Sequence, residues 1–484
     1  MLHSTDFYLS MDVSRSPMFK LTHRIIILVL LATVVVWNIP AIATWYYLNF
    51  HAEDKVIYQT FQVPYAPHDQ IQPKLNLEAS LYRAPRPFNR RTLWVNSGGP
   101  FKQVDSLEEI LKQLPPVIKA THDVIMLDWR LHSNNRLSQA LSNQTPERCS
   151  AWLKTHASNL GTLASVHDME YVRQALGIER ISLLGYSYGA TMLTHYAAMF
   201  PERVEAMVLD SPSYVLQTDL IQGLYQKLQW LGKTAQHKFE VLGYDFNQYL
   251  DFVQHLDRQD NQVVAADGRR FSLESVLRDM DGFFGIDSSS SEAFPLESIC
   301  GSQANIPYLI QLIDIGAPLA SDSSVVFTDL DFYKAGFIFG YQPDELLDEI
   351  GWLRAFTSVR PLPILAPKSI ALPQAPLIVF NDYDPIVSTE RVQYITERYH
   401  QAHTLKVENA GFHAATFTKM PTRCVSDAVT AYLMDPDINR NQLPLTCDAI
   451  TKTEKRYRQL KHYLDFLQLE GQKESITLGD EVEH

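Results

Sequence analysis

A serine flanked by glycines is the residue of this sequence best suited to nucleophilic catalysis. Ser187 is the middle residue of the pentapeptide GYSYG at 185–189, which follows the apolar run ISLL and precedes a helical stretch at 191–200. A serine in a tight strand-to-helix turn needs glycine on either side, because a Cβ there would collide with neighbouring backbone. The following helix directs its first N–H groups and its positive dipole end toward that hydroxyl. The pattern predicts that Ser187 is a nucleophile.

Two later residues can activate such a serine. A serine hydroxyl is a weak nucleophile unless a histidine removes its proton, and a carboxylate must orient that histidine. Where the serine lies at a strand-to-helix turn, the acid and the histidine follow later strands in that order. Asp384 follows the apolar run PLIVF, and His413 follows LKVENAG. We therefore expect Asp384 and His413 to complete a triad with Ser187.

The choice of acid leaves alternatives. Asp382 lies two residues before Asp384 and is its rival. We favour Asp384 because it precedes Pro385 and a helix expected to begin near Ser388, and such a fixed turn can hold one rotamer. An aspartate here could instead serve as a turn or N-cap residue. His413 could be a hydrogen-bonded polar residue beneath the surface rather than a base.

The oxyanion formed on a substrate carbonyl needs two N–H donors. One is expected from Tyr188, directly after the nucleophile. The other is expected from the loop after an earlier strand, where the run LWVN leads into Gly98 and Gly99. Paired glycines let the backbone approach a substrate oxygen without an intervening side chain. An ordinary glycine turn is the alternative explanation.

These residues require a sheet that brings several strand ends together. Between about residues 54 and 212, short runs rich in Val, Ile and Leu alternate with amphipathic helical stretches, which is typical of an α/β sheet. The later strands read as buried and parallel. A helix is expected within 104–114, ended by prolines at 115 and 116, and another before Gly177. The expected strands are 56–63, 74–82, 92–95, 124–127, 181–184, 206–209, 376–380 and 405–408.

The sheet is interrupted by an insert. Residues 213–365 lack strand alternation and carry many Leu, Phe and Tyr at spacings of three and four, which predicts a mainly helical cap. Residues 287–292 contain four consecutive serines and are expected to form a mobile loop there. The expected organisation is a first core part at 51–212, the cap at 213–365, a second core part at 366–450, and a C-terminal helical extension and tail at 451–484.

The N-terminal segment predicts export. Residues 25–37 are apolar and uncharged, and Arg15, Lys20 and Arg24 precede them, an asymmetry that retains the N-terminus in the cytoplasm. The small residues before and at Ala43 suit cleavage of a signal peptide after that residue. Residues 25–48 are also long enough to span a bilayer as an anchor. Residues 1–50 are thus a signal peptide or a membrane anchor, and the remainder is expected in the periplasm or outside the cell.

Composition excludes several classes of protein. With 484 residues, of which 46% are hydrophobic and 20% charged, the chain matches a globular protein rather than a disordered or fibrous one. A net charge of −13 repels phosphate backbones, so we expect no nucleic-acid partner. The sequence has no evident metal-ligand cluster, phosphate-binding loop or dinucleotide motif, so we expect no metal and no cofactor. Four cysteines allow two bridges in an exported chain, in three pairings.

Several segments together resemble a known family. The chain resembles the α/β-hydrolase peptidases that include the proline iminopeptidases and the secreted bacterial tripeptidyl aminopeptidases. The resemblance is carried by NSGGP at 96–100, DVIMLDWR at 123–130, the long block at 167–212, and the segments around Asp384 and His413. It implies an α/β-hydrolase fold, with a mostly parallel sheet, helices on both faces and an inserted helical cap that selects substrates.

The resemblance also implies roles for individual residues. Ser187 would be the nucleophile, His413 the base and Asp384 its orienting acid, with Gly99 and Tyr188 as the oxyanion donors. The C-terminal cysteines resemble a bridged pair of the family, so we expect a Cys424–Cys447 disulfide and also a Cys149–Cys300 disulfide between core and cap. Family aminopeptidases hold the substrate's ammonium with acidic cap residues, for which Glu292 and Glu297 are among the candidates.

The sequence departs from the family pattern near the site. Phe101 replaces the glycine expected after Gly-Gly-Pro, Leu131 replaces the glycine expected after Asp-x-Arg, and Phe412 and Ala414 flank a histidine that glycines usually flank. We expect these changes to crowd the site and to affect substrate size more than chemistry. They leave all three triad residue types in place.

Three hypotheses for the function follow. The first is an exported serine aminopeptidase that acts through an acyl-enzyme on short peptides with a free N-terminus. The second is an esterase or other acyl hydrolase with the same triad, because the cap decides among substrates. The third is a noncatalytic binding protein that retains a hydrolase fold. The expected partner is a small peptide or ester substrate, with membrane attachment only through the N-terminal segment, and the oligomeric state stays open.

Overall fold

The computed structural model describes most of the predicted core. The described residues are 55–66, 74–85, 91–99, 106–130, 159–212, 220–248, 262–265, 268–272, 369–399, 401–410, 412–416, 422–449 and 460–466, together with the single residues 148, 156, 250 and 458. The expectations for the N-terminal segment and for the 287–292 loop fall on residues outside this set. The same holds for Phe101, Leu131, Glu292, Glu297 and the Cys149–Cys300 pair.

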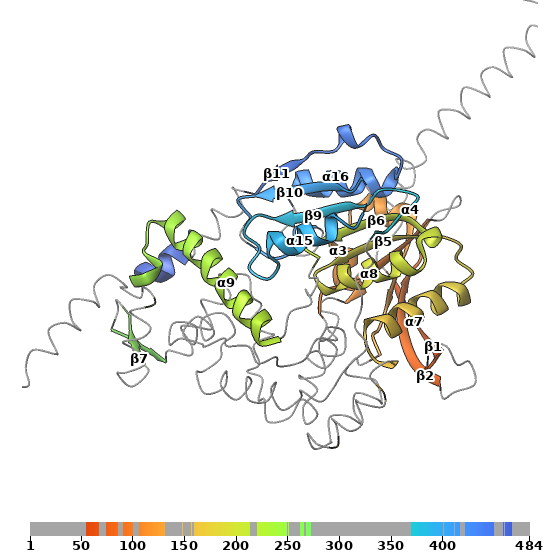
Figure 1. The fold of residues 1–484 in the computed structure, drawn as a ribbon, viewed down its shortest axis with the longest axis horizontal. Helices are drawn as coiled ribbons and strands as arrows, with labels where there is room; N and C mark the ends of the chain where they lie inside the picture. Colours follow the sequence, from red (N-terminus) through yellow and green to blue (C-terminus); the bar gives the residue numbers. More distant parts are fainter. Residues whose placement is uncertain are drawn as a thin grey trace, which may run out of the picture.

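One large sheet forms the centre of the molecule (Figure 1). Within the described residues it has nine strands in the order β1-β2-β4-β3-β5-β6-β9-β10-β11. The pairs β1–β2 and β2–β4 are antiparallel, and every later pair in that order is parallel. The strands are β1 (Val56–Pro64), β2 (Lys74–Tyr82), β3 (Arg91–Asn96), β4 (His122–Leu127), β5 (Ile181–Tyr186), β6 (Val204–Asp210), β9 (Leu377–Asn381), β10 (His403–Glu408) and β11 (Thr446–Asp448).

The eight strands expected from the sequence are all present, within a few residues at each end. β6 and β9 pair directly in parallel, with Val208 opposite Leu377, although residues 211–376 separate them along the chain. The sheet is therefore interrupted and resumed as the apolar pattern indicated. β11 was not expected, because three residues around Cys447 form too short a run to show a period.

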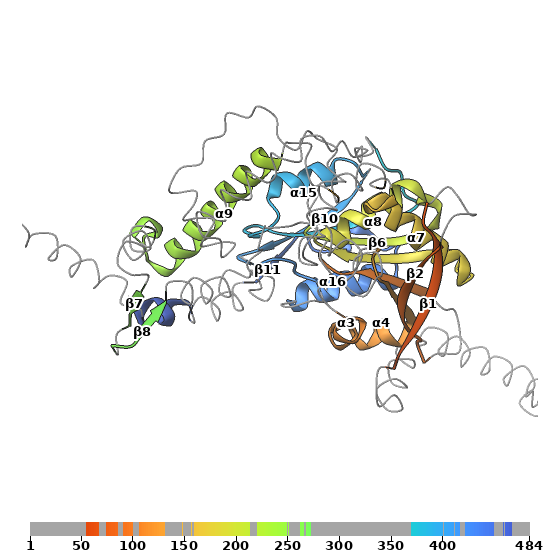
Figure 2. The ribbon, with the colours of Figure 1, turned by 90° about the horizontal axis from the view of Figure 1, so that it is seen from below.

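Helices cover both faces of this sheet (Figure 2). One face carries α7 (Thr162–Ala175), α8 (Tyr188–Met199) and α15 (Thr389–Thr396), and the other carries α3 (Leu107–Gln113), α4 (Pro116–Thr121) and α16 (Arg423–Met434). Central strands supply both layers: in β3, Trp94 belongs to the first hydrophobic cluster, whereas Leu93 and Val95 belong to the second. Alternating side chains of buried parallel strands thus fill a core on each side of the sheet.

Local signals explain where the helices begin and end. Ser106 caps α3 in a capping box with Glu109, and Gly177 follows α7 with a φ of +66°. The expectation that two prolines simply end the first helix was incomplete. α3 ends at Gln113, and Pro116 then begins α4, because proline lacks only an N–H that the first turn of a helix leaves unpaired anyway.

Part of the predicted cap region is described. It contains the long helix α9 (Leu220–Leu242) and the antiparallel pair β7 (Gln262–Val264) and β8 (Arg270–Ser272). The helical spacing of leucines from residue 220 onward is confirmed by α9. Residues 273–368, which make up most of the remaining insert, lie outside the described residues, so the mainly helical cap at 213–365 stays a prediction.

The helical residues 460–466 lie against this region rather than against the sheet (Figure 2). The rings of Phe466 and Phe271 have centroids 5.8 Å apart, and the Lys461 Nζ lies 3.2 Å from the Tyr244 hydroxyl, which also donates a hydrogen bond to Asp465. The C-terminal helical segment therefore fastens the end of α9 to the β7–β8 pair.

A disulfide closes the last part of the core. Cys424 in α16 is bonded to Cys447 in β11, with their Cα atoms 5.8 Å apart. This confirms the expected Cys424–Cys447 bridge. It ties the edge strand to the helix that covers it, across 23 residues of sequence.

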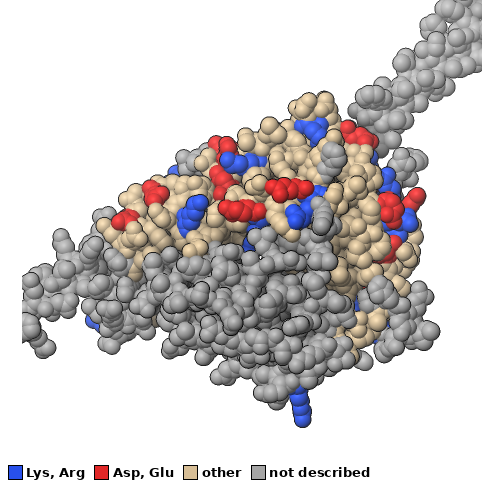
Figure 3. Space-filling view, viewed as in Figure 1, with Lys and Arg blue, Asp and Glu red and all other residues tan. Residues whose placement is uncertain are grey.

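The described surface and helices add two observations. On the face shown in Figure 3, the acidic and basic side chains of the described residues are interspersed. Among the helices that the structure describes, none is both long and apolar enough to cross a membrane. Residues 25–48 are outside that set.

Candidate active site

Ser187 lies at the turn between β5 and α8. Its backbone has φ 55° and ψ −128°, a conformation that non-glycine residues adopt at a cost of about 1–3 kcal/mol and that concentrates at functional sites. The turn is held by its N–H, which donates to the carbonyl of Asp210 at 2.9 Å, and by its carbonyl, which accepts from Ala190 N at 3.1 Å. The strand-turn-helix position predicted from the sequence is thus confirmed.

The two elbow glycines are required by close contacts. A Cβ on Gly185 would lie 2.7 Å from Leu193 Cδ1 and 2.9 Å from Ala190 N, and one on Gly189 would lie 2.3 Å from the Ser97 carbonyl oxygen. Such separations are far inside van der Waals contact, so a side chain would displace backbone. The collision expected for both positions is confirmed.

The glycine loop after β3 runs beside the nucleophile. A Cβ on Gly98 would lie 3.3 Å from Ser187 Cβ and 3.0 Å from the Tyr186 ring, and Gly99 follows, partly exposed. The backbone of this loop is therefore close enough to Ser187 to serve an oxyanion bound there. Gly99 as the donor stays a prediction.

Tyr188 directs its side chain away from the turn. Its hydroxyl pairs with Thr162 in α7, and its ring meets Trp129 edge to face with centroids 5.2 Å apart. Both contacts anchor the first residue of α8 in the core. The oxyanion-donor role predicted for Tyr188 therefore concerns its backbone N–H and, like that of Gly99, stays a prediction.

Asp384 and His413 form a close pair. The His413 Nδ1 lies 2.9 Å from each carboxylate oxygen of Asp384, which is 1% exposed. Asp384 Oδ1 also accepts from the backbone N–H groups of Ile386 at 2.8 Å and Val387 at 3.0 Å, at the turn that leads to α15. Since Nδ1 faces a carboxylate, it carries the proton, and Nε2 is the ring atom that can accept one.

The rival acid has a different contact. The carboxylate of Asp382 accepts from Asn409 N at 3.1 Å and Ala410 N at 3.4 Å, just after β10. The neighbouring Asn381 Nδ2 donates to the carbonyl of Phe412. These two residues hold the segment before His413, whereas Asp384 meets its ring.

Sequence reasoning missed Asp210, the last residue of β6. Its carboxylate is fully buried and accepts from Ala415 N at 2.7 Å and Thr416 N at 2.6 Å, directly after His413. Burial raises the pKa of Asp210, while the Thr416 and Ala415 bonds and the nearby His413 oppose that rise. The signal in the sequence was an acid ending the apolar run AMVL, the same signal that identified Asp384.

The strand order explains why these residues meet. β5, β6, β9 and β10 are consecutive and parallel, so their C-terminal ends lie along one edge of the sheet. Ser187 follows β5, Asp210 ends β6, Asp384 follows β9 and His413 follows β10. Asp210 contacts both the Ser187 backbone and the segment after His413. Serine, acid and histidine are therefore gathered at this one edge.

A helix of the cap region reaches the acid. Trp230 Nε1 in α9 donates to the Asp384 carbonyl at 2.7 Å, and the His237 ring stacks on Tyr383 with centroids 3.6 Å apart and planes 9° apart. Burial lowers the pKa of His237, and the nearby Asp382 opposes that effect. α9 thus contacts both Asp384 and the residue before it.

One departure from the family pattern is accommodated inside the core. Phe412 is 3% exposed and belongs to the hydrophobic cluster that also contains Val407 and Ala415. Its added bulk therefore fills the core, contrary to the expectation that it would crowd the site. Ala414 has a φ of +57°, the left-handed region that favours the glycine expected there.

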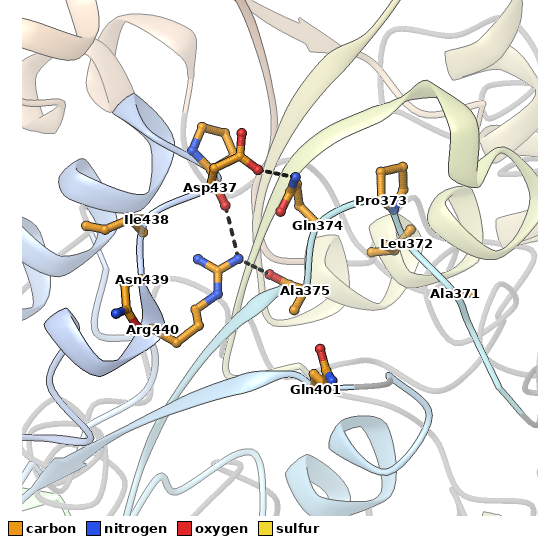
Figure 4. A pocket seen from close by; sticks show the side chains of 11 residues that line it. Ala371, Leu372, Pro373, Gln374, Ala375, Gln401, Asp437, Ile438, Asn439 and Arg440 are labelled. Atoms are coloured by element: carbon orange, nitrogen blue, oxygen red, sulfur yellow. Dashed lines mark hydrogen bonds between the residues drawn. The ribbon is translucent and has the colours of Figure 1, made fainter.

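A cavity of about 460 Å³ lies elsewhere (Figure 4). It is lined by residues 371–375, Gln401 and 436–440, before the start of β9, whereas Asp384 follows the end of that strand. Arg440 bridges it by donating to the Ala375 carbonyl at 2.8 Å. Its position at the opposite end of β9 separates it from the triad.

Among the described residues, no group of three or more His, Cys, Asp or Glu is placed to hold a metal ion.

Comparison with known families agrees with this geometry. Residues 96–286 match the family described as alpha/beta hydrolase fold, and residues 351–444 match the family described as TAP-like protein. The chain therefore has an α/β-hydrolase fold and carries a segment similar to the TAP-like family. The first matched segment contains Ser187, and the second contains Asp384 and His413.

Individual relatives match only short stretches. The serine protease Hip1 of Mycobacterium tuberculosis is 42% identical over 57 residues, which are 12% of this chain and 11% of Hip1. The tripeptidyl aminopeptidase of Streptomyces lividans is 29% identical over 79 residues, which are 16% of this chain and 15% of that protein. The chain thus matches less than a fifth of either relative's length. A crystal structure of a serine hydrolase from Cycloclasticus zankles, at 15% identity and a TM-score of 0.35, covers 79% of this chain and 100% of that one.

Proposed function

We propose that this protein is an exported aminopeptidase that releases N-terminal residues or short peptides through an acyl-enzyme. The observation that carries the proposal is the Asp384–His413 pair at the sheet edge where Ser187 occupies a strained turn. The match of residues 351–444 to a TAP-like family, and the similarity to a serine protease and to a tripeptidyl aminopeptidase, favour peptides over other acyl substrates.

The proposed reaction has two halves. His413 Nε2 takes the proton of the Ser187 hydroxyl as Oγ attacks the scissile carbonyl carbon, and the carbonyl electrons move to the oxygen. The backbone N–H groups of Tyr188 and Gly99 stabilise that oxyanion. The imidazolium, held by Asp384, gives its proton to the leaving amine as the C–N bond breaks. Water then attacks the ester carbon with His413 again as base, which releases the acid and restores Ser187.

Export is supported by two features. The Cys424–Cys447 disulfide is of a kind that persists in oxidising compartments, and residues 25–48 form the apolar segment expected of a signal peptide or an anchor. Fractionation of expressing cells, followed by nonreducing peptide mapping, tests this. Recovery of the chain outside the cytoplasm with this bridge formed is expected, whereas a cytoplasmic chain with free thiols would contradict export.

A covalent probe tests the serine-hydrolase chemistry. A fluorophosphonate should label the wild-type protein and should not label Ser187→Ala, because the probe forms a bond to the activated serine oxygen. Labelling of Ser187→Ala to the wild-type extent would assign the chemistry to another residue. A wild-type protein that binds short peptides but neither labels nor hydrolyses would favour the noncatalytic binding protein.

A substrate panel tests the peptidase half. Chromogenic aminoacyl and tripeptidyl amides should be hydrolysed, and the same compounds with an acetylated N-terminus should not, since an aminopeptidase recognises the free ammonium. Short-chain esters provide the comparison. Turnover of esters without turnover of any amide would establish the esterase alternative instead.

A further inference from the structure

Asp210 is a buried residue whose two carboxylate oxygens both accept hydrogen bonds beside the candidate active-site residues. It ends β6, between the strands that precede Ser187 and Asp384, and it is 0% exposed. Oδ2 accepts from Ala415 N and Thr416 N at 2.7 and 2.6 Å, and Oδ1 accepts from the Ser211 hydroxyl at 3.1 Å. A carboxylate buried this deeply persists only with such partners, so its position is tightly determined.

The same residue holds the nucleophile. The carbonyl oxygen of Asp210 accepts the N–H of Ser187 at 2.9 Å. Asp210 therefore connects the turn that carries Ser187 to the segment that carries His413, through one bond to its carbonyl and two to its carboxylate. Only the short side chain of this one aspartate separates the contact with Ser187 from the contacts after His413.

The His413 segment depends on this anchor downstream of the ring. Upstream, Asp382 and Asn381 hold the backbone at Asn409, Ala410 and Phe412. Downstream, the carboxylate of Asp210 holds the backbone N–H groups of Ala415 and Thr416. Ala414, between the ring and that anchor, has the unfavourable φ of +57°. A left-handed alanine costs about 1–2 kcal/mol, so bonded neighbours must stabilise it.

The negative charge of the Asp210 carboxylate has a second effect, on the imidazole of His413. His413 and Asp210 interact electrostatically, in addition to the Asp384–His413 contact. Among the described residues, the titratable groups that face the His413 segment include Asp384 and Asp382 from the acid turn, Asp210 from β6 and Asp448 from β11, and His237 from α9 lies beside the acid turn. A negative charge near an imidazole favours its protonated form, which is the form that arises when the serine is deprotonated.

We propose that Asp210 is a positioning residue of this active site, which fixes the backbone after His413 and, through its negative charge, stabilises the imidazolium formed during attack by Ser187. This inference rests on the proposed serine-hydrolase function. It gives the carboxylate a role distinct from that of Asp384, which touches the ring itself.

Two substitutions separate geometry from charge. Asp210→Asn retains an oxygen for the Ala415 and Thr416 N–H groups and can donate its amide to Ser211, so it removes mainly the charge. Asp210→Ala removes both and leaves two buried N–H groups without an acceptor. Asp123→Asn is the matched control: Asp123 is a buried strand acid that accepts from Ala84 N at 2.9 Å, but at the start of β4.

The measurement is the second-order rate of fluorophosphonate labelling between pH 5 and 9, with thermal unfolding of each variant. Asp210→Ala should lower the rate by about 100-fold or more. Asp210→Asn should lower it by about tenfold and move the midpoint of the acid limb downward by about one pH unit, because loss of the negative charge lowers the imidazole pKa. Asp123→Asn should match the wild type in both rate and midpoint.

The outcomes are distinguishable. Wild-type labelling with unchanged rates and midpoints in both Asp210 variants would overturn the role of Asp210 alone. A lower rate in Asp210→Asn without any movement of the midpoint would overturn the electrostatic part. Absence of labelling in the wild type would overturn the proposed function and this role with it. If Asp210→Ala does not fold, the rate and midpoint of Asp210→Asn decide.

Discussion

The Nδ1 atom of His413 lies 2.9 Å from each carboxylate oxygen of Asp384, with two backbone N–H groups holding Oδ1 from the other side. The acid is thus fixed before any substrate arrives, and the ring has one orientation toward it. Asp382, only two residues away, instead holds Asn409 and Ala410. Two carboxylates in one turn therefore have separable effects on the same histidine.

Replacing Asp384 by asparagine should abolish most activity without unfolding the protein. An amide presents an N–H where the carboxylate accepted one, so it favours the wrong tautomer of His413, and we expect kcat/KM to fall by about 10³- to 10⁴-fold. Asp382→Asn is the matched change and should cost less than about tenfold. Hydrolysis rates and urea unfolding of both variants provide the measurement. An equal loss in the two variants would mean that Asp384 has no special relation to the ring.

Alanine at Gly189 should disrupt the elbow. The added Cβ would meet the Ser97 and Asn96 carbonyl oxygens at 2.3 and 2.4 Å, so either α8 or the loop after β3 must move. We expect a loss of about 3 kcal/mol or more in the free energy of unfolding, together with loss of labelling at Ser187. Gly243→Ala is the control, because a Cβ there meets nothing within 4 Å and only its φ of +80° is unfavourable. That variant should lose about 1 kcal/mol and retain labelling; a stable, fully labelled Gly189→Ala would refute the steric argument.

The sequence predicted those parts of the fold whose signals are local. Buried parallel strands are continuous apolar runs, so β5, β6 and β9 could be read directly, whereas β11 is only three residues around Cys447 and shows no period. Pro116 was read as an end signal because proline marks both the stop of one helix and the first turn of the next. Whether a proline ends one helix or begins the next depends on whether the chain continues as a helix after it, as it does at Pro116 in α4.

The residues of the candidate site likewise fall into those with a local signal in the sequence and those without one. Ser187, Asp384 and His413 each follow an apolar run and a turn, so their neighbours in sequence identified them. Asp210 and Trp230 act through partners 205 and 154 residues away, at Ala415 and Asp384. No pattern within either local segment specifies such a partner. The choice between Asp382 and Asp384 was likewise open until their contacts were known.

Removing the Trp230 hydrogen bond should impair the acid turn moderately. Trp230→Phe keeps an aromatic ring on α9 but leaves the Asp384 carbonyl without the 2.7 Å bond from the indole N–H. The expected effect is a fall of about three- to tenfold in kcat with little change in the free energy of unfolding, since one partly buried hydrogen bond contributes about 1 kcal/mol. Gln236→Ala, an exposed change on the same helix, is the control. Unchanged kcat in Trp230→Phe would show that α9 does not support Asp384.

Acid should destabilise the fold through His195, which is buried in α8. Burial lowers its pKa to about 4, from the ordinary value of 6.5. Above pH 6.5 the imidazole is neutral in both states; as the pH falls toward 4, the unfolded chain binds a proton that the folded chain does not, so stability is lost. This lowering of the pKa corresponds to a loss of roughly 3 kcal/mol in the free energy of unfolding by the time the pH has fallen to about 4. Urea unfolding between pH 7 and 4 should therefore show a shallower loss in His195→Gln than in the wild type, because other groups titrate equally in both and cancel in the difference. Parallel curves for the two proteins would exclude His195 as a source of acid sensitivity.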